Sequence, residues 1–167
     1  MDIIKKAGMQ ECKPFTSPMS TSITISIASS FANPTHFKQL AGALQYLTVT
    51  RPEIQMAVNV VCQKMHSPTV SDCVALKQTI RYIQGSVGFG LRFKPVTKAE
   101  LIAYSDTTWA ADIVDRRYVT GYCIFFGPNM ISWAAKKQPT VSRSSTEAEY
   151  RALASTAAEV IWLQYIL

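Results

Sequence analysis

The chain contains few of the residues from which zinc sites and disulfide frameworks are built. It has four cysteines and two histidines in 167 residues. Cys12, Cys62, Cys73 and Cys123 form no C-x-x-C pair, and no histidine stands at zinc-finger spacing from them. The sequence therefore predicts neither a zinc knuckle nor a disulfide-stapled secreted domain, and it favours a reducing compartment.

Long uncharged hydrophobic runs are also absent. The first residues read M-D-I-I-K-K with no apolar run behind them, which does not match a secretory signal. The longest weakly charged stretch, residues 152–167, is too short to span a bilayer and contains Glu159, so a core helix is favoured. We therefore expect no membrane segment and an intracellular location, cytoplasmic or nuclear, without secretion.

Acidic residues are scarce in the first part of the chain. Residues 1–98 carry 11 Lys/Arg and 4 Asp/Glu, a net +7, whereas residues 99–167 carry 6 and 7, a net −1; the two add to the overall +6. A basic segment favours a polyanionic partner such as nucleic acid, because Lys and Arg release counterions from phosphates. A solvated basic surface that keeps the protein soluble is the simpler alternative.

The first half of the chain has the apolar spacing of helices. Residues 1–34 include a segment rich in Ser, Thr and Pro and are predicted to form an irregular connector. Helices are expected over 36–50, 52–65 and 70–84, within a basic helical region that extends from 35 to 98. Pro52 suits the first turn of the second helix, because a backbone N–H at that position would have no intrahelical acceptor in any residue.

The pattern changes at Gly88 to short runs rich in β-branched and aromatic residues. These runs are G-L-R-F, L-I-A-Y-S-D, Y-V-T-G-Y-C-I-F-F-G and N-M-I-S-W-A. The G-P-N segment between the last two predicts a hairpin. We expect residues 101–106, 118–126 and 129–134 to form an antiparallel three-stranded sheet and a helix to begin near Ser144. The fold class is therefore mixed α/β, with residues 99–167 as a β-β-β-α unit.

Three carboxylates are candidates for chemistry. Asp106 ends an apolar strand, although a turn aspartate bonded to its own backbone is the simpler interpretation. Glu147 and Glu149 stand at the head of the last helix, and both also fit a capping box with a preceding Ser or Thr. If the buried stripe of the helix is 150, 153, 157, 160 and 161, the two glutamates lie on its opposite margins, so helical phase does not choose between them.

A series of motifs resembles one family over nearly the whole chain, from about residue 5 to residue 167. These motifs are L-A-G-A-L-Q-Y-L-T-V-T-R-P-E-I-Q-M-A-V-N, L-K-Q-T-I-R-Y-I-Q-G-S, A-Y-S-D, D-R-R, T-G-Y-C-I-F-F-G, I-S-W-A-A-K-K-Q and S-R-S-S-T-E-A-E-Y-R-A-L-A. Together they resemble the pol polyprotein of copia-type LTR retrotransposons. The resemblance implies the thumb or connection of a reverse transcriptase followed by a ribonuclease H domain. The polymerase motif Y-V-D-D does not occur in the sequence.

The resemblance implies a role for individual residues. Asp106 matches the central metal-bridging aspartate, and Glu147 matches the glutamate at the head of the first helix, so both would be catalytic ligands of two Mg²⁺ ions. Glu149 would remain a surface or capping residue. The implied reaction is cleavage of RNA in RNA–DNA hybrids during element replication. Contacts with nucleic acid are expected from Arg116, Arg117, Lys136, Lys137 and Arg143.

The same comparison implies an incomplete domain. The family pattern S-D-A-D-W-A-G is replaced by S-D-T-T-W-A-A, with Thr108 and Ala111 at the changed positions, although D-R-R is kept from Asp115. In the family fold the helix that ends near Leu167 is followed by further strands and further acids. We therefore expect an incomplete Mg²⁺ site and little activity of the isolated chain.

Three functions stay open at this point. The chain is a remnant without activity of its own, a nucleic-acid-binding remnant or domesticated interaction protein, or a hydrolase completed by the remaining pol segments. An incomplete sheet would expose an unpaired strand edge, and it would also expose Ile161, Trp162, Ile166 and Leu167. We therefore expect the isolated chain to oligomerise or aggregate.

Overall fold

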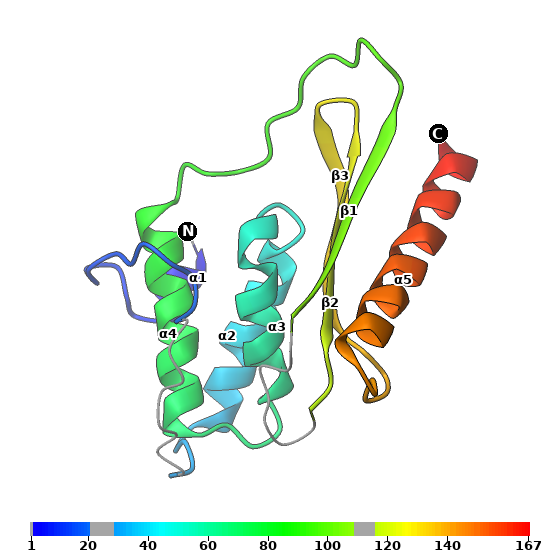
Figure 1. Ribbon diagram of the computed structural model, residues 1–167. Coiled ribbons are helices and arrows are strands. Elements are labelled where there is room, and N and C mark those ends of the chain that lie inside the picture. Colours follow the sequence, from blue (N-terminus) through cyan, green and yellow to red (C-terminus); the bar gives the residue numbers. More distant parts are fainter. Residues whose placement is uncertain (1, 21–28, 109–115) are drawn as a thin grey trace. The chain divides into compact units, whose positions relative to one another are not determined.

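A computed structural model describes residues 2–20, 29–108 and 116–167 of the chain (Figure 1). The chain divides into two compact units, Met1–Gly90 and Leu91–Leu167. The first unit contains α1 (Asp2–Lys6), α2 (Pro34–Leu47), the 3₁₀ turn η1 (Pro52–Ile54), α3 (Gln55–Gln63) and α4 (Val70–Gly85). The second contains β1 (Leu101–Thr108), β2 (Val119–Phe126), β3 (Asn129–Lys137) and α5 (Ser145–Ile166). The predicted mixed α/β class is confirmed.

Local sequence explains where the helices of the first unit begin. Pro34 occupies the first turn of α2, and the Asn33 side chain accepts a hydrogen bond of 3.0 Å from the His36 N–H. Thr69 and Asp72 cap α4 reciprocally, each side chain accepting from the other residue's backbone N–H. These caps satisfy amide groups that the first helical turn leaves without partners.

The apolar stripes of the four helices form one core in the first unit. The core is aliphatic apart from one ring, Phe37, and one thiol, Cys73. Its other members are Ile3, Ile4, Leu40, Ala41, Leu44, Ile54, Val58, Val61, Leu76, Ile80 and Ile83. Burying each large aliphatic side chain contributes about 1.5–3 kcal/mol relative to exposure, so this cluster is the main source of stability in the unit.

The N-terminal connector is irregular but attached to α4 through side chains of the helix. Gln84 donates from Nε2 to the Gln10 carbonyl at 2.9 Å, and Arg81 donates from Nε to the Lys13 carbonyl at 2.7 Å. The Arg81 guanidinium also lies 4.5 Å from the centre of the Phe15 ring. These contacts hold the described part of the connector against α4. The short helix α1 at the start of the segment was not expected, because residues 1–34 were predicted to be irregular.

Arg51 connects the start of α3 to the end of α4. Its side chain is 5% exposed and donates to the Ser86 carbonyl at 3.0 Å and to Ser86 Oγ at 2.7 Å. It also pairs with the Glu53 carboxylate. Because a buried guanidinium is costly unless its donors are satisfied, this arrangement fixes the two helix ends together.

The three strands of the second unit form the predicted antiparallel sheet in the order β1-β2-β3. Gly127, at φ +54°, makes the turn between β2 and β3, as the G-P-N segment indicated. The register shifts between Ile124 and Phe125, which marks a bulge. The G-L-R-F run was wrongly interpreted as strand-like, because residues 91–100 lie in no helix or strand.

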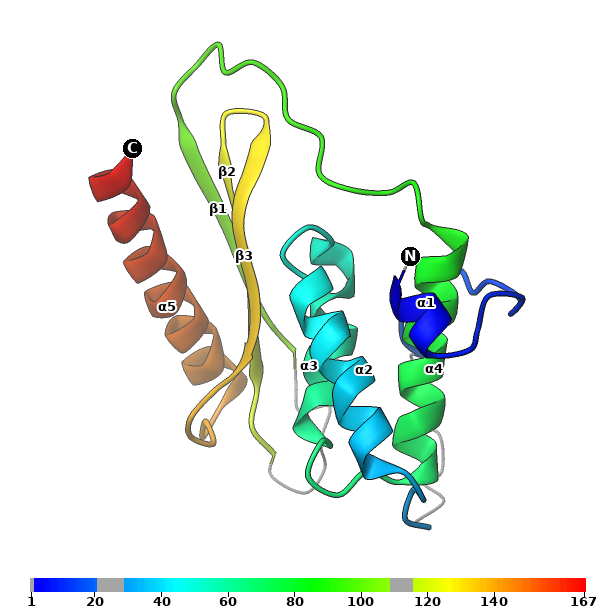
Figure 2. The same ribbon diagram turned by 180° about the vertical axis from the view of Figure 1, so that it is seen from behind.

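Helix α5 packs on one face of this sheet, as seen from both sides in Figures 1 and 2. Gln138 donates from Nε2 to Thr120 Oγ1 at 3.1 Å and to the Ala148 carbonyl at 3.0 Å. Because side chains alternate along a strand, Thr120 identifies the α5 face, and its β1 partner Thr107 lies on the same face. Asp106 therefore belongs to the opposite face.

The buried stripe of α5 differs from the one that we predicted. The residues that the helix buries are Ala148, Ala152, Thr156 and Leu163. Tyr150, Leu153 and Ile161, which we placed in the core, are more than half exposed. The small side chains allow the helix to approach the sheet closely, and the larger ones remain on its outer surface. No helix within the described residues has the length and hydrophobicity needed to cross a membrane.

Candidate functional site

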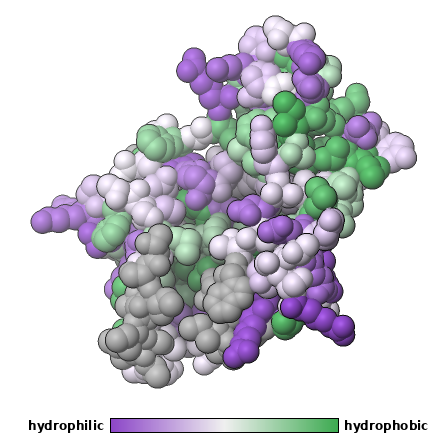
Figure 3. All heavy atoms as spheres, viewed as in Figure 1, coloured by the Kyte–Doolittle hydropathy of each residue, from purple (hydrophilic) through white to green (hydrophobic). Residues whose placement is uncertain are grey.

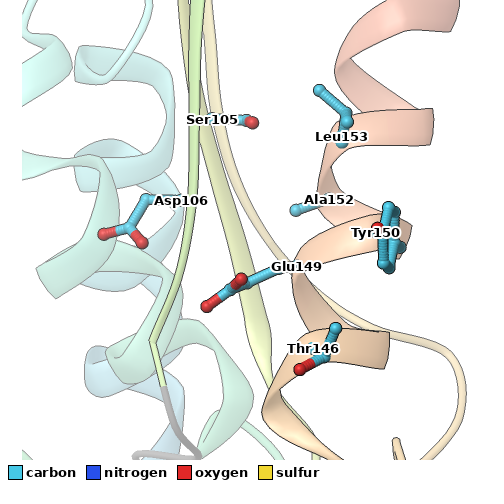
Figure 4. A pocket seen from close by; sticks show the side chains of 7 residues that line it. All are labelled: Ser105, Asp106, Thr146, Glu149, Tyr150, Ala152 and Leu153. Atoms are coloured by element: carbon cyan, nitrogen blue, oxygen red, sulfur yellow. The ribbon is translucent and has the colours of Figure 1, made fainter.

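Asp106 lies near the C-terminal end of β1, opposite Gly121 of β2. In Figure 4 its side chain projects away from α5, whereas the neighbouring Ser105 points toward the helix. Asp106 Oδ1 accepts a hydrogen bond of 2.7 Å from the N–H of Thr107, the next residue. The carboxylate is exposed and bonded to its own backbone, which corresponds to the simpler interpretation of this residue.

Glu147 caps the N-terminus of α5. The Ser144 hydroxyl accepts from the Glu147 N–H at 3.1 Å, and Glu147 Oε2 accepts from the Arg143 N–H at 2.7 Å. Arg151 donates to Glu147 Oε1 from Nε at 3.1 Å and from Nη2 at 2.8 Å. The Arg143 N–H, and then the Arg151 guanidinium, lower the pKa of this carboxyl below its usual value. Glu147 is therefore a charged cap with protein donors on both oxygens.

Asp106 and Glu147, which were predicted to share a metal site, have different hydrogen-bond partners in the structure. Asp106 faces away from α5 because its neighbours Ser105 and Thr107 occupy the strand positions that face the helix. Glu147 is turned toward Arg143 and Arg151 instead. Among the described residues there is also no cluster of three or more His, Cys, Asp or Glu able to hold a metal ion. Metal binding shared by Asp106 and Glu147 stays a prediction.

Glu149 is the glutamate that reaches the cleft between α5 and β1. A hollow of about 400 Å³ is lined by Ser105, Asp106, Thr146, Glu149, Tyr150, Ala152 and Leu153. Figure 4 shows Glu149 extending from the helix toward β1. We expected a surface or capping role for this residue. The signal that could have found it is the small-residue stripe of α5, because Glu149 precedes buried Ala152 by three positions and so lies beside the buried face.

The predicted nucleic-acid contacts lie at one end of the sheet. Lys136 and Lys137 end β3, opposite Thr120 and Val119 at the start of β2. The other members precede β2 or α5 and are Arg116, Arg117 and Arg143. β1 ends beside the start of β2, so Asp106 lies at the same end.

Two of these cations have defined local geometry. Arg117 donates from Nη1 to the Pro139 carbonyl at 3.3 Å, which connects the segment before β2 to the loop after β3. Arg116 has φ +50°, an uncommon left-handed conformation for a residue other than glycine. Ala111 and Asp115, which we compared with the family pattern, lie outside the described residues. Thr108 is the last residue of β1.

This end of the sheet can bind an anion more readily than a metal. Five cationic residues lie near the ends of three elements; Arg116, Lys136 and Arg143 are exposed, and Arg117 and Lys137 are partly exposed. Of the carboxylates nearby, Glu147 is bonded to Arg151, and Asp106 and Glu149 line the hollow between α5 and β1. The geometry therefore favours contact with a polyanion, because Lys and Arg supply most phosphate contacts in nucleic-acid complexes.

Comparison with known proteins gives relatives over the entire chain. It is 49% identical to an uncharacterised mitochondrial protein of Arabidopsis thaliana over 161 residues, which is 96% of this chain and 67% of that protein. It is 40% identical to the retrovirus-related Pol polyprotein from transposon RE2 of Arabidopsis thaliana over 100% of this chain. It spans 12% of the length of that polyprotein.

A third relative has a different description. A protein named secreted RxLR effector protein 161, from Plasmopara viticola, is 42% identical over 123 residues, which is 73% of this chain and 87% of that protein. No protein-family model matches the chain. No solved structure matches it either.

Proposed function

Because this chain belongs to the family of retrovirus-related Pol sequences from copia-type plant transposons, we propose that it is a Pol-derived segment that binds RNA–DNA hybrids without cleaving them by itself. The proposed binding unit comprises residues 91–167 and is related to ribonuclease H. The first unit corresponds to the thumb or connection of the polymerase. The known relatives named Pol are far longer, so the activities of a whole polyprotein are not assigned to this chain.

The order of elements in the second unit supports its relationship to ribonuclease H. Three antiparallel strands are followed by a long helix on one face, with an aspartate late in the first strand and two glutamates in the first turns of the helix. The S-T-E-A-E-Y and A-Y-S-D motifs occupy these positions. The order of elements and the family membership of the sequence together support the proposed relationship to ribonuclease H.

The grouping of five cations at one end of the sheet is the observation on which the binding proposal depends. Arg116 and Arg117 approach from the start of β2, the two lysines from the end of β3, and Arg143 from the head of α5. Each phosphate that a cation neutralises releases condensed counterions, so affinity falls steeply with salt. With three to five phosphate contacts, log Kobs should fall with log salt with a slope of roughly −3 to −4.

The residues present do not fit the two-Mg²⁺ site that the family implies. Mg²⁺ requires near-octahedral oxygen coordination, and two ions at fixed spacing require several convergent carboxylates. Asp106 and Glu147 point to different surroundings, and Glu147 is engaged by Arg151. We therefore assign no metal-dependent step to the 167-residue chain. Completion of the site by the remaining Pol segments is an alternative that the cleavage assay addresses.

The binding proposal is tested with a fluorescent RNA–DNA hybrid and a charge-neutralised variant. Replacing Lys136, Lys137 and Arg143 with Gln should weaken hybrid binding by at least about tenfold and reduce the salt slope by roughly 2–3. The matched control replaces Arg92, Lys94 and Lys98, which precede β1 and change the net charge equally. The control should retain most of the affinity.

Equal losses in the two variants would show that net charge, and not this end of the sheet, determines binding. Affinity of the parent chain that does not change with salt would also contradict the proposal. Circular dichroism of each variant establishes that the comparison is made between folded proteins. A duplex DNA competitor of the same length measures the preference for the hybrid.

A further inference from the structure

Most of the outer surface of α5 is apolar and exposed. The helix buries four small or medium side chains against the sheet and leaves large ones uncovered, which are Tyr150, Leu153, Ile161, Trp162, Tyr165 and Ile166. Beyond Arg151 its only charged side chain is Glu159, which accepts a hydrogen bond from Ser132 of β3. Figure 3 shows hydrophobic residues gathered at the right of the view, where Figure 1 places α5.

The exposed area is large enough to matter energetically. Tyr150, Trp162 and Tyr165 are 68%, 55% and 86% exposed. Since each aromatic side chain can bury about 150–250 Å², these three alone leave on the order of 400 Å² uncovered. Monomeric proteins rarely expose more than a few hundred Å² of contiguous apolar surface, and a stable interface takes about 800 Å² from each partner. Trp162 and Tyr165 are turned about 120° and 60° around the helix from Tyr150, so this apolar area is spread around the exposed side of α5.

The β1 strand beside α5 has an open edge. It pairs with β2 along its whole length, and no strand of the described chain pairs with its other edge. Protected edge strands usually carry proline, lysine or a bulge, and β1 has none of these. Asp106 is its only charged residue. The backbone groups of this edge are therefore available to a second strand.

A regular stripe of α5 residues lies on the side of the helix toward this open edge. Tyr150, Leu153, Ala157, Val160 and Gln164, which we call the α5 seam, follow one another at alternating intervals of three and four. This is the spacing at which two helices pack against each other. Two of its members, Tyr150 and Leu153, line the hollow described above together with Ser105 of β1, which shows that the seam lies on the β1 side of the helix.

We propose that two copies of this chain associate through antiparallel pairing of their β1 edges, with their α5 seams packed side by side. In an antiparallel pair of strands the two-fold axis is perpendicular to the sheet, so both helices lie on the same face of one continuous six-stranded sheet. The contact is isologous, because each copy contributes the same strand and the same helix. This inference does not depend on the proposed binding of nucleic acid.

The spacing of the elements satisfies this arrangement. Neighbouring strands lie about 4.8 Å apart, and α5 packs over β1 and β2. A helix above the line between β1 and β2 would then lie about 10 Å from its symmetry copy across the paired edges. Packed helices are typically 8–10 Å apart, so strand pairing and helix packing can occur together.

The seam itself favours a second copy over a charged partner. The five seam residues carry no ionic side chain, and the carboxylates of Glu149 and Asp106 border the seam at one end only, in the hollow that they share with Tyr150 and Leu153. Ala157 lies at its middle, with Leu153 on one side and Val160 on the other. In an antiparallel pair centred near Ala157, the larger residues of one helix meet the larger residues of the other around a point of close approach.

Two adjacent exposed alanines provide a matched test. Ala157 lies in the seam, whereas Ala158 is turned about 100° around the helix and away from it. By sedimentation velocity, the parent chain and Ala158→Glu should form dimers at micromolar concentration. Ala157→Glu should dissociate at least about tenfold more readily, because both copies place a carboxylate in the apolar contact. If Ala157→Glu loses its helical circular dichroism, Gln164→Lys, on the same exposed stripe, replaces it.

Hydrogen exchange distinguishes this dimer from other associations. Amides of residues 101–108 that point away from β2 should exchange more slowly at high protein concentration than at low concentration. A parent chain that stays monomeric at all concentrations would overturn the proposal. So would open-ended aggregates, equal effects of the two alanine substitutions, or a dimer whose β1 amides exchange as in the monomer.

Discussion

Ser132 of β3 donates a hydrogen bond of 2.8 Å from Oγ to Glu159 Oε1 of α5, and this contact identifies the face of the sheet that the helix covers. Ser132 pairs with Ile124, which pairs with Ala103 of β1. These residues therefore share the α5 face, and Asp106, three positions after Ala103, lies on the other. Tyr122 also lies on the α5 face, and the pKa of its hydroxyl is raised above the usual value. Burial is the main cause; the hydrogen bond with Ser132 lowers this pKa, and the negative charge of Glu159 raises it.

Ser132→Ala should destabilise the second unit. The substitution leaves the half-buried Glu159 carboxylate without its serine donor, which costs about 1–2 kcal/mol of unfolding free energy. Ser155→Ala on the exposed surface of α5 is the control and should change stability by less than about 0.5 kcal/mol. Urea denaturation followed by circular dichroism measures both. A Ser132→Ala protein as stable as the control would show that the contact does not hold the helix.

Arg51 should be among the residues most sensitive to substitution in the first unit. Arg51→Ala removes two hydrogen bonds from a buried guanidinium to Ser86 and the ion pair with Glu53, although the Ser86 carbonyl keeps the Phe89 N–H and Ser86 Oγ keeps the Tyr82 carbonyl. We expect a loss of about 2–3 kcal/mol in the free energy of unfolding, because hydrogen bonds to a charged group contribute about 1.5–3 kcal/mol. Arg81→Ala, whose partners lie in the exposed connector, should cost less. The urea midpoints of the two variants show which substitution destabilises the protein more.

Two glycines of the first unit should respond to alanine in opposite ways. Gly42 lies in the interior of α2 with open space around it, so Gly42→Ala should stabilise by up to about 1 kcal/mol. A Cβ on Gly85, at the end of α4, would lie 2.7 Å from the Pro14 Cβ of the connector. Gly85→Ala should therefore displace the connector and lower the melting temperature. Two stabilised proteins would show that the connector is not packed on α4.

The depressed pKa of Glu147 makes a prediction about acid stability. A carboxyl whose folded pKa lies below its unfolded value stabilises the protein above the unfolded pKa, and this stabilisation is lost as pH falls through the folded pKa. The stability difference between the parent chain and Glu147→Gln should thus be largest near neutral pH and shrink below about pH 4.3. Glu149→Gln, at a residue outside the cap, is the control. A difference that does not change with pH would contradict the assignment of Glu147 as a charged cap.

The sequence predicted the elements better than the packing of α5. Strands and helices came from local patterns, and even the hairpin turn at Gly127 was foreseen, because turn and cap chemistry act within a few residues. The exposure of Trp162, Ile166 and Leu167 was also expected and is confirmed. The buried stripe was wrong because hydrophobicity favoured Tyr150 and Leu153, whereas the helix in fact packs through alanines.

The local contacts of the carboxylates could not be predicted from the sequence either. Two capping boxes overlap at the head of α5, and local sequence gives Glu147 and Glu149 equal claims to the cap. Only the contacts of Arg143 and Arg151 show that Glu147 holds it. The face of β1 that carries Asp106 depends on the pairing with β2 and β3, which a single strand pattern does not specify.

Cleavage of an RNA–DNA hybrid in Mg²⁺ tests the account most directly. The assay compares the 167-residue chain, its Asp106→Asn variant and a version extended by further Pol segments, all at a protein concentration that binds the hybrid. We predict that the short chain binds hybrid but releases no RNA fragments above the level of Asp106→Asn, because the side chain of Asp106 projects away from α5 and Glu147 is bonded to Arg151. Mg²⁺-dependent cleavage by the short chain that disappears in Asp106→Asn would contradict this account.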